Sequence, residues 1–144
     1  MEYIICSFFG DGNCFCTEEV KSTVKKTVEK LITENGVNVF LFASRSEFEL
    51  LCLKTVTELK NMYPHVRCLY VRAERGYVNE EYKEFVANNY DDTFCPVESS
   101  AKRNRYIIDN SEYCVFGGKT AINTKTAYKY ATKRKRHVVD LQKE

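Results

Sequence analysis

The chain has 144 residues, a formal net charge of +2 and a hydrophobic fraction of 44%. This length is enough for one domain over residues 1–144, and the composition excludes a disordered or low-complexity protein. The net charge is too small to indicate a charged partner.

Seven cysteines form an odd count, and Cys6, Cys68 and Cys114 lie in apolar runs, where a free thiol behaves as a small hydrophobe. We therefore expect a reduced cytoplasmic protein without a disulfide framework. The N-terminal segment has no basic region and is too short for a spanning helix, so neither a signal peptide nor a membrane anchor is expected.

Short apolar runs bounded by turn residues predict five strands, at residues 3–9, 37–42, 66–71, 113–116 and 137–141. Apolar residues at helical spacing predict two helices, with Thr17 and Ser46 as N-caps. Glu49 follows Ser46 at the third position, which is the pattern of a capping box. Gly36 and Pro64 supply the stops of these helices.

Further helices are predicted at about residues 99–110 and 119–134. Between the third and fourth predicted strands, residues 73–97 form a longer excursion. We expect a short helix there at about residues 80–88, and an extended piece near Phe94.

Alternating strands and helices predict an α/β fold with three layers, Rossmann-like, with about five mainly parallel strands and helices on both faces. The first strand, YIICSFF, is apolar on both faces, as a central parallel strand must be. We therefore place it inside the sheet and not at its edge.

Open parallel sheets bind ligands beyond the carboxyl ends of their strands, where the strand order reverses. The first and fourth predicted strands flank that position, and both run into glycine-bearing turns, at residues 10–13 and 117–120. We predict that these two turns lie on one rim of one cleft.

Gly117, Gly118, Lys119 and Thr120 resemble the end of a phosphate-binding loop, but Tyr113 stands where a Walker A loop has its first glycine. A nucleoside triphosphatase is therefore excluded. The turn still suits one phosphate or carboxylate at a helix N-terminus, whereas helix capping by Thr120 is the structural alternative.

The first turn, Gly10-Asp11-Gly12-Asn13, has two interpretations. Its backbone could approach a ligand closely, with Asp11 or Asn13 bonding a ribose or base. Alternatively, its glycines serve a tight turn with positive φ.

Metal and nucleic-acid binding have weaker signals. Cys14 and Cys16 form a C-x-C pair without a second ligand pair, so no metal site is expected. The basic run at residues 133–137 falls at a helix end, where cations favour the helix dipole. We therefore interpret this run as a solvated face, and nucleic acid is not expected as a partner.

The chain resembles small proteins of the SLOG superfamily in three stretches. They are FFGDG after the first predicted strand, RNRYIIDNSEYCVF leading into and including the fourth, and GGKTAINTKTAYKYATKRKRHVVDL after it. That superfamily also contains the LOG phosphoribohydrolases and the DprA-type DNA-processing proteins. The likeness is greatest to its short bacterial and phage-borne branch, and it covers nearly the whole chain.

The resemblance implies a pocket for a nucleotide or a nucleotide-derived molecule, with no resident cofactor. Backbone N–H donors, the helix dipole and Lys119 converge at the start of the last helix, so we expect the charged group of the ligand nearest Gly118, Lys119 and Thr120 and the sugar or base nearest the first turn. With Asn13 added from the first turn, the candidate ligand-binding residues are Gly10, Asp11, Gly12, Asn13, Ser44, Arg45, Arg103, Asn104, Gly117, Gly118, Lys119 and Thr120.

The chain departs from the family pattern at two places. Asp11-Gly12 stands where short members often have a His-Arg pair, and Asn123 and Thr124 stand where the phosphoribohydrolases carry glutamates. Hydrolysis of an N-glycosidic bond normally needs a carboxylate. We therefore expect a binding module, either a sensor or a sequestering protein, and assign no catalytic residue.

Two alternatives stay open. A nucleoside-monophosphate hydrolase could take its acid from Asp11, Glu74 or Asp109. A protein-interaction or nucleic-acid module could have kept the fold and lost the pocket, an alternative that the missing His-Arg pair favours. A homo-oligomer is also left open, because related pockets are often completed at a dimer interface.

Overall fold

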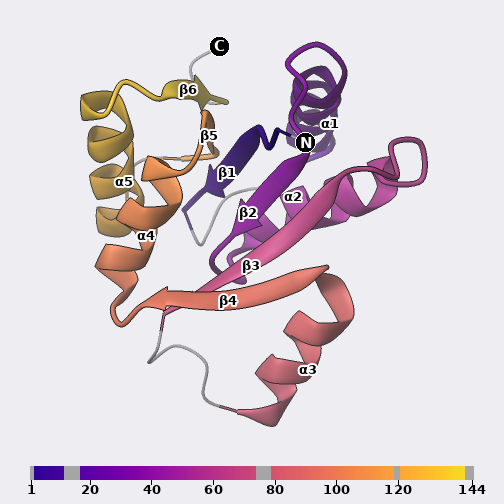
Figure 1. The fold of residues 1–144 in the computed structure, drawn as a ribbon. Helices are drawn as coiled ribbons and strands as arrows, with labels where there is room; N and C mark the ends of the chain where they lie inside the picture. The colour runs from indigo at the N-terminus through magenta and orange to yellow at the C-terminus, as the bar shows by residue number, and fades with distance from the viewer. Residues whose placement is uncertain (1, 12–16, 74–78, 119–120, 142–144) are drawn as a thin grey trace.

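The computed structural model describes residues 2–11, 17–73, 79–118 and 121–141. Strands and helices alternate along these ranges (Figure 1). The strands are β1 (Ile5–Phe9), β2 (Val39–Phe42), β3 (Arg67–Ala73), β4 (Asp92–Val97), β5 (Tyr113–Phe116) and β6 (His137–Asp140). The helices are α1 (Glu18–Thr33), α2 (Glu47–Leu59), α3 (Glu80–Asn89), α4 (Ser100–Asp109) and α5 (Ile122–Lys133).

The six strands form one parallel sheet in the order β4-β3-β2-β1-β5-β6. The predicted three-layer, Rossmann-like α/β fold is therefore confirmed, and β1 lies inside the sheet, between β2 and β5. The chain moves outward from β1 to β4 and then returns to the other side of β1. The strand order consequently reverses between β1 and β5.

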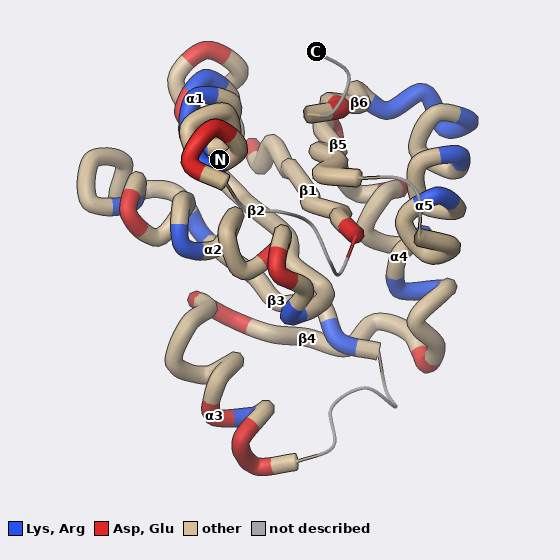
Figure 2. Tube along the Cα trace, turned by 180° about the vertical axis from the view of Figure 1, so that it is seen from behind, with Lys and Arg blue, Asp and Glu red and all other residues tan. Residues whose placement is uncertain are grey.

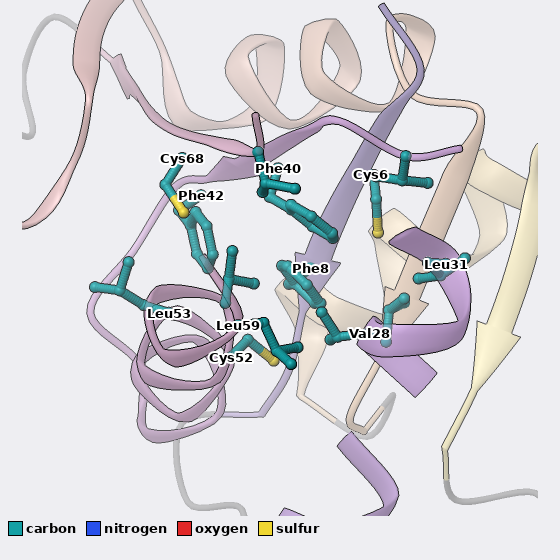
Figure 3. Close-up of a cluster of buried hydrophobic side chains, with 14 of the residues drawn as sticks. Cys6, Phe8, Val28, Leu31, Phe40, Phe42, Cys52, Leu53, Leu59 and Cys68 are labelled. Atoms are coloured by element: carbon teal, nitrogen blue, oxygen red, sulfur yellow. The ribbon is translucent and has the colours of Figure 1, made fainter. Parts of the chain in front are cut away.

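Each face of the sheet has its own hydrophobic core. On one face, α1, α2 and α3 cover a cluster that includes Phe8, Phe40 and Phe42. The Phe8 ring stacks on the other two, with centroids 5.6 and 5.2 Å apart (Figure 3). On the other face, α4 and α5 cover a second cluster with Ile107 and Ala131 among its buried members.

The helix starts follow local signals. Thr17 Oγ1 accepts a hydrogen bond from the Val20 amide at 3.2 Å, and Ser46 Oγ accepts one from the Glu49 amide at 3.2 Å. Both predicted N-caps are thereby confirmed. Gly36 has a φ of 72°, as expected for a residue that stops a helix.

β4 is a complete edge strand, where only an extended piece near Phe94 was expected. All of its residues are exposed or half-buried, so it lacks the continuous apolar run that reveals a central strand. Pro96 is tolerated because an edge strand has one unpaired side. Among the described helices, none has both the length and the apolarity needed to cross a membrane.

Candidate functional site

The carboxyl ends of β1 and β5 lie side by side where the strand order reverses. The Gly117 amide donates a hydrogen bond to the Phe9 carbonyl at 2.8 Å, and the Ala121 amide donates to Asp11 Oδ1 at 3.0 Å. The structure thus brings together the described parts of the two glycine turns. The other members of these turns, Gly12, Asn13, Lys119 and Thr120, lie outside the described residues.

Glycine is needed at two of these positions because a side chain from α2 packs against the backbone. A Cβ atom at Gly10 would lie 2.4 Å from Phe48 Cδ2, and one at Gly117 would lie 2.3 Å from Phe48 Cδ1. Among the described glycines, only Gly36 has a positive φ, so the positive-φ interpretation is wrong for Gly10. Close packing of Phe48 accounts for both glycines.

Asp11 links the end of β1 to the start of α5. Its side chain is buried, and its carboxylate accepts the amide hydrogen of Ala121, the N-cap residue of α5. A Cβ atom at Gly118 would lie 2.5 Å from Asp11 Oδ2. Because Ala121 has no polar side chain of its own, a carboxylate from 110 residues away serves the start of this helix.

A cavity of about 230 Å³ opens beside this link. Residues from the ends of β1 and β2 and from the first turns of α2, α4 and α5 line it. Four predicted ligand-binding residues are among them: Gly10, Ser44, Arg103 and Asn104. The lining also includes four polar side chains that the sequence prediction did not assign to a ligand: Ser46, Glu49, Asn123 and Thr124.

Glu49 is the buried carboxylate of this cleft. Its Oε1 accepts hydrogen bonds from the amides of Ala43 at 2.9 Å and Ser44 at 3.2 Å, and Oε2 accepts one from Ser44 Oγ. The predicted capping box is therefore only half formed. The Ser46 amide donates to Ser44 Oγ at 3.2 Å instead of to Glu49.

The charge state of Glu49 reflects two opposing influences. Burial raises the pKa of its carboxyl, while the hydrogen bonds from Ala43 and Ser44 and the positive charge of Arg103 lower it. A carboxylate with a raised pKa in a polar cleft is a frequent feature of functional sites.

Arg103 is the cation of the cleft and lies in the first turns of α4. Its Nε and Nη2 atoms both donate to Asn104 Oδ1, each at 3.3 Å. Burial lowers the pKa of the Arg103 guanidinium, and the negative charge of Glu49 raises it. The cleft thus holds opposite charges that come from α2 and α4.

Arg45, a predicted ligand-binding residue, packs its guanidinium against aromatic rings of α3. Its guanidinium carbon lies 4.2 Å from the ring centroid of Tyr82 and 5.6 Å from that of Phe85, both on α3. These contacts are cation–π interactions. Arg45 therefore contacts α3 and is not among the described residues that line the cleft.

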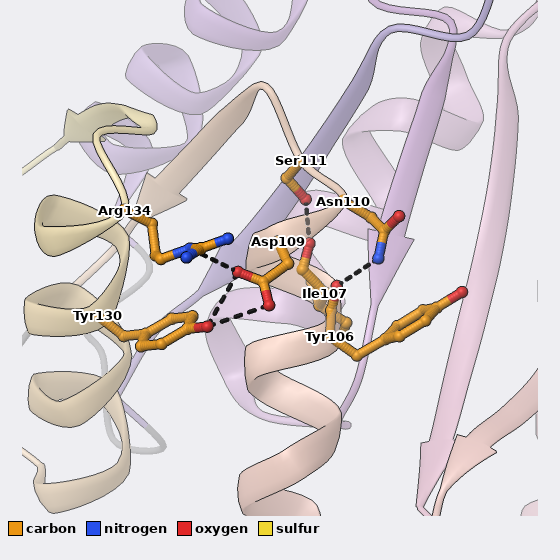
Figure 4. A network of polar contacts seen from close by, with 7 residues as sticks. All are labelled: Tyr106, Ile107, Asp109, Asn110, Ser111, Tyr130 and Arg134. Carbon is orange, nitrogen blue, oxygen red and sulfur yellow. Dashed lines mark hydrogen bonds and ion pairs between the residues drawn. The ribbon is translucent and has the colours of Figure 1, made fainter.

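Asp109, one of the acids considered for catalysis, lies at the far end of α4 from Arg103. It accepts hydrogen bonds from Tyr130 Oη at 2.9 and 3.0 Å and pairs with Arg134 Nε at 3.0 Å (Figure 4). Of the other two acids considered, Asp11 serves the start of α5, and Glu74 lies outside the described residues. Asp109 therefore acts in the contact between α4 and the end of α5.

The sequence contained partial signals for the four polar residues that were missed. Glu49 was recognised only as a capping residue, because its position three residues after Ser46 explains it locally. Asn123 and Thr124 were noted only because the resemblance matches them to glutamates of the phosphoribohydrolases. In the described part of the chain, no group of three or more His, Cys, Asp or Glu side chains could hold a metal ion.

Comparison with models of known protein families gives no match for the chain, and comparison with curated proteins gives none. Membership of the SLOG superfamily therefore stays a prediction from the motifs.

Proposed function

We propose that the protein is a SLOG-like module that binds a nucleotide-derived ligand in the cleft where the strand order reverses. The observation that carries this proposal is the presence of Arg103 and the buried carboxylate of Glu49 in one polar cavity beyond the strand ends. This is the position where open α/β sheets bind their ligands. A cation and an acceptor together suit a phosphate joined to a hydroxyl-bearing sugar.

The charged group of the ligand lies nearest Arg103 in this proposal. A phosphate beside Gly118 would face the carboxylate of Asp11, which already accepts from the Ala121 amide, and like charges repel. The guanidinium of Arg103 offers a bidentate donor to phosphate. For this reason we prefer Arg103 to the position expected from the sequence, beside Gly118, Lys119 and Thr120.

The sugar or base lies nearest Glu49 and the amides of the cleft. Glu49 Oε2 accepts from Ser44 Oγ and can accept a further hydrogen bond from a ligand hydroxyl. Asn104 and Asn123 supply both donors and acceptors at the cavity wall.

A melting experiment tests the proposal. A panel of ribonucleoside mono-, di- and cyclic phosphates is added to the protein, and a ligand at 100 times its dissociation constant should stabilise the fold by about 2.7 kcal/mol. Arg103→Gln should remove this stabilisation. The matched control is Arg67→Gln, because Arg67 is an exposed cation at the opposite, amino end of β3.

No shift with any nucleotide would contradict the proposal and favour a protein-interaction module. A shift that Arg103→Gln leaves intact would place the ligand elsewhere.

A second candidate function is hydrolysis of the N-glycosidic bond of such a ligand, and Glu49 is the observation that favours it. A buried carboxylate with a raised pKa could take the proton of a water molecule as its oxygen attacks C1′ of the ribose. The bond from C1′ to the base breaks as the bond from C1′ to the water oxygen forms, and the departing base takes up a proton from solvent water. Chromatographic detection of free base, lost in Glu49→Gln, would establish this activity.

A further inference from the structure

A basic groove runs between α4 and α5. Its volume is about 540 Å³, and four cations line it: Arg103, Arg105, Lys129 and Lys133. No Asp or Glu is among the described residues that line it. We call this feature the α4–α5 groove.

The groove belongs to a strongly basic part of the molecule. Residues 100–144 contain 11 of the 22 Lys and Arg residues of the chain but only 4 of the 20 Asp and Glu residues. Figure 2 shows Lys and Arg along α5 and in α4, whereas α1 and α3 carry Lys together with Glu. Asp109, the acid at the end of α4, is engaged by Tyr130 and Arg134. A charge asymmetry of this kind favours an anionic partner on the basic side.

The groove and the cleft are neighbours. Arg103, Asn104 and Asn123 line both cavities, so the cleft and the groove lie next to each other. The volume of the cleft, about 230 Å³, is below the range of roughly 300–1,000 Å³ typical of small-molecule sites. A ligand of nucleotide size or larger therefore extends beyond the cleft.

We propose that the ligand is a short linear oligonucleotide, with one end in the cleft and its following phosphates along the α4–α5 groove. This inference rests on the proposed function, because the cleft must hold the terminal nucleotide. From Asn123 to Lys133 the groove follows α5 for roughly 15 Å, given the rise of about 1.5 Å per helical residue. At about 3.4 Å per stacked nucleotide, this length accommodates about four phosphates.

The chemistry of the cleft favours a nucleic-acid chain over an acidic peptide. The cleft presents a carboxylate and two side-chain amides, which pair with sugar hydroxyls and base edges. A peptide of acidic residues would bring its charge against Glu49. The cations that line the groove are distinct from those of the basic run except for Lys133, so the helix-end interpretation of that run does not account for them.

The test measures binding as a function of chain length. The probes are 5′-phosphorylated RNA pools with random bases, containing one, two, four or twelve nucleotides, together with a tetraglutamate peptide. We expect the dissociation constant to fall about tenfold from one to four nucleotides, because additional phosphates meet cations. We expect little further gain at twelve, because the groove ends at Lys133.

Two double variants identify the groove. Lys129→Ala with Lys133→Ala should return the four-nucleotide affinity to the mononucleotide value and leave mononucleotide binding unchanged. Lys26→Ala with Lys125→Ala removes the same charge, and neither residue is among the described residues that line the groove. This control should keep the gain with chain length. Arg103→Gln should weaken binding of every probe.

Each contrary result has a distinct meaning. Equal binding of one and four nucleotides, with both depending on Arg103, overturns the groove proposal and leaves the proposed function standing. Absence of mononucleotide binding to the unaltered protein overturns the proposed function, and with it this inference. Equal losses in the two double variants, a large further gain at twelve nucleotides, or equal binding of tetraglutamate would show general charge attraction and overturn the oligonucleotide assignment.

Discussion

The starts of α2 and α5 border the same cleft, yet they are held in different ways. At α2, Ser46 Oγ accepts from the Glu49 amide, and the carboxylate of Glu49 turns back to Ala43 and Ser44. All of these groups lie within seven consecutive residues. At α5, the N-cap residue Ala121 makes no side-chain bond, and Asp11 supplies the acceptor from the end of β1.

The difference separates what a local sequence pattern determines from what only the folded sheet provides. The α2 start can form as soon as its own residues meet. The α5 start is complete only after β1 and β5 have paired, because Asp11 and Ala121 are 110 residues apart. The cleft therefore has one wall with a local origin and one wall that depends on tertiary structure.

The largest loss of stability is expected where Phe48 of α2 packs against the backbone of Gly10 and Gly117. Gly117→Ala places a methyl group 2.3 Å from the Phe48 ring, which is already packed against Gly10. The free energy of unfolding should fall by about 3 kcal/mol, measured by urea denaturation. Adding Phe48→Leu to the Gly117→Ala protein should restore part of this loss. If Gly117→Ala left the free energy of unfolding unchanged within experimental error, the close packing of Phe48 would be disproved.

The next largest loss of stability is expected at the start of α5, where the acceptor comes from β1. Asp11→Ala removes the buried carboxylate that accepts the Ala121 amide hydrogen at the start of α5, so stability should fall by about 2 kcal/mol. Asp11→Asn keeps an acceptor oxygen and should cost less. Equal losses in the two variants, again measured by urea denaturation, would show that charge rather than hydrogen bonding holds this contact.

Substitutions at the start of α2 should reduce stability less. Ser46→Ala removes one N-cap bond at α2 and should cost about 1 kcal/mol. Thr17→Ala is the matched control at α1, where the cap is exposed. If Ser46→Ala cost more than Asp11→Ala, the contrast between the two helix starts would be wrong.

The final prediction concerns pH and has a definite sign. Burial raises the pKa of Glu49 above 4.5, its ordinary value, so the folded protein binds more protons than the unfolded chain between these two pKa values. Stability contributed by Glu49 is therefore present at low pH and is lost as the pH rises through this interval. Glu49→Gln has no such titration, so its stability should improve relative to the unaltered protein as the pH rises above 4.5. Parallel pH profiles would contradict the burial of this charge.

Much of the fold could be predicted because its signals are local or strongly periodic. Thr17 and Ser46 mark their helices directly, and the continuous apolar run of β1 places it inside a parallel sheet. β4 gave a weaker signal, because an edge strand has no need for apolar residues on both faces.

The site could be predicted only in outline. The positions of Gly10 and Ser44 followed from the rule that strand-to-helix turns meet at one edge of the sheet, whereas Arg103 and Asn104 were expected from the resemblance. The hydrogen-bond partners of the Asp11 and Glu49 carboxylates could not be derived in the same way. They depend on which backbone amides come within reach after folding, and neither pattern nor spacing specifies that choice.

The most direct test of the central claim is a map of backbone amide chemical shifts during titration with an equimolar mixture of the four ribonucleoside 5′-monophosphates. Binding in the cleft predicts saturable shifts for the amides of Ala43, Ser44, Asn104 and Thr124, because these residues line the cavity. The cavity between α1 and α2, which includes Lys21 and Glu58, should be unaffected. Shifts confined to that second cavity, or no saturable shift at the four cleft amides, would contradict the account.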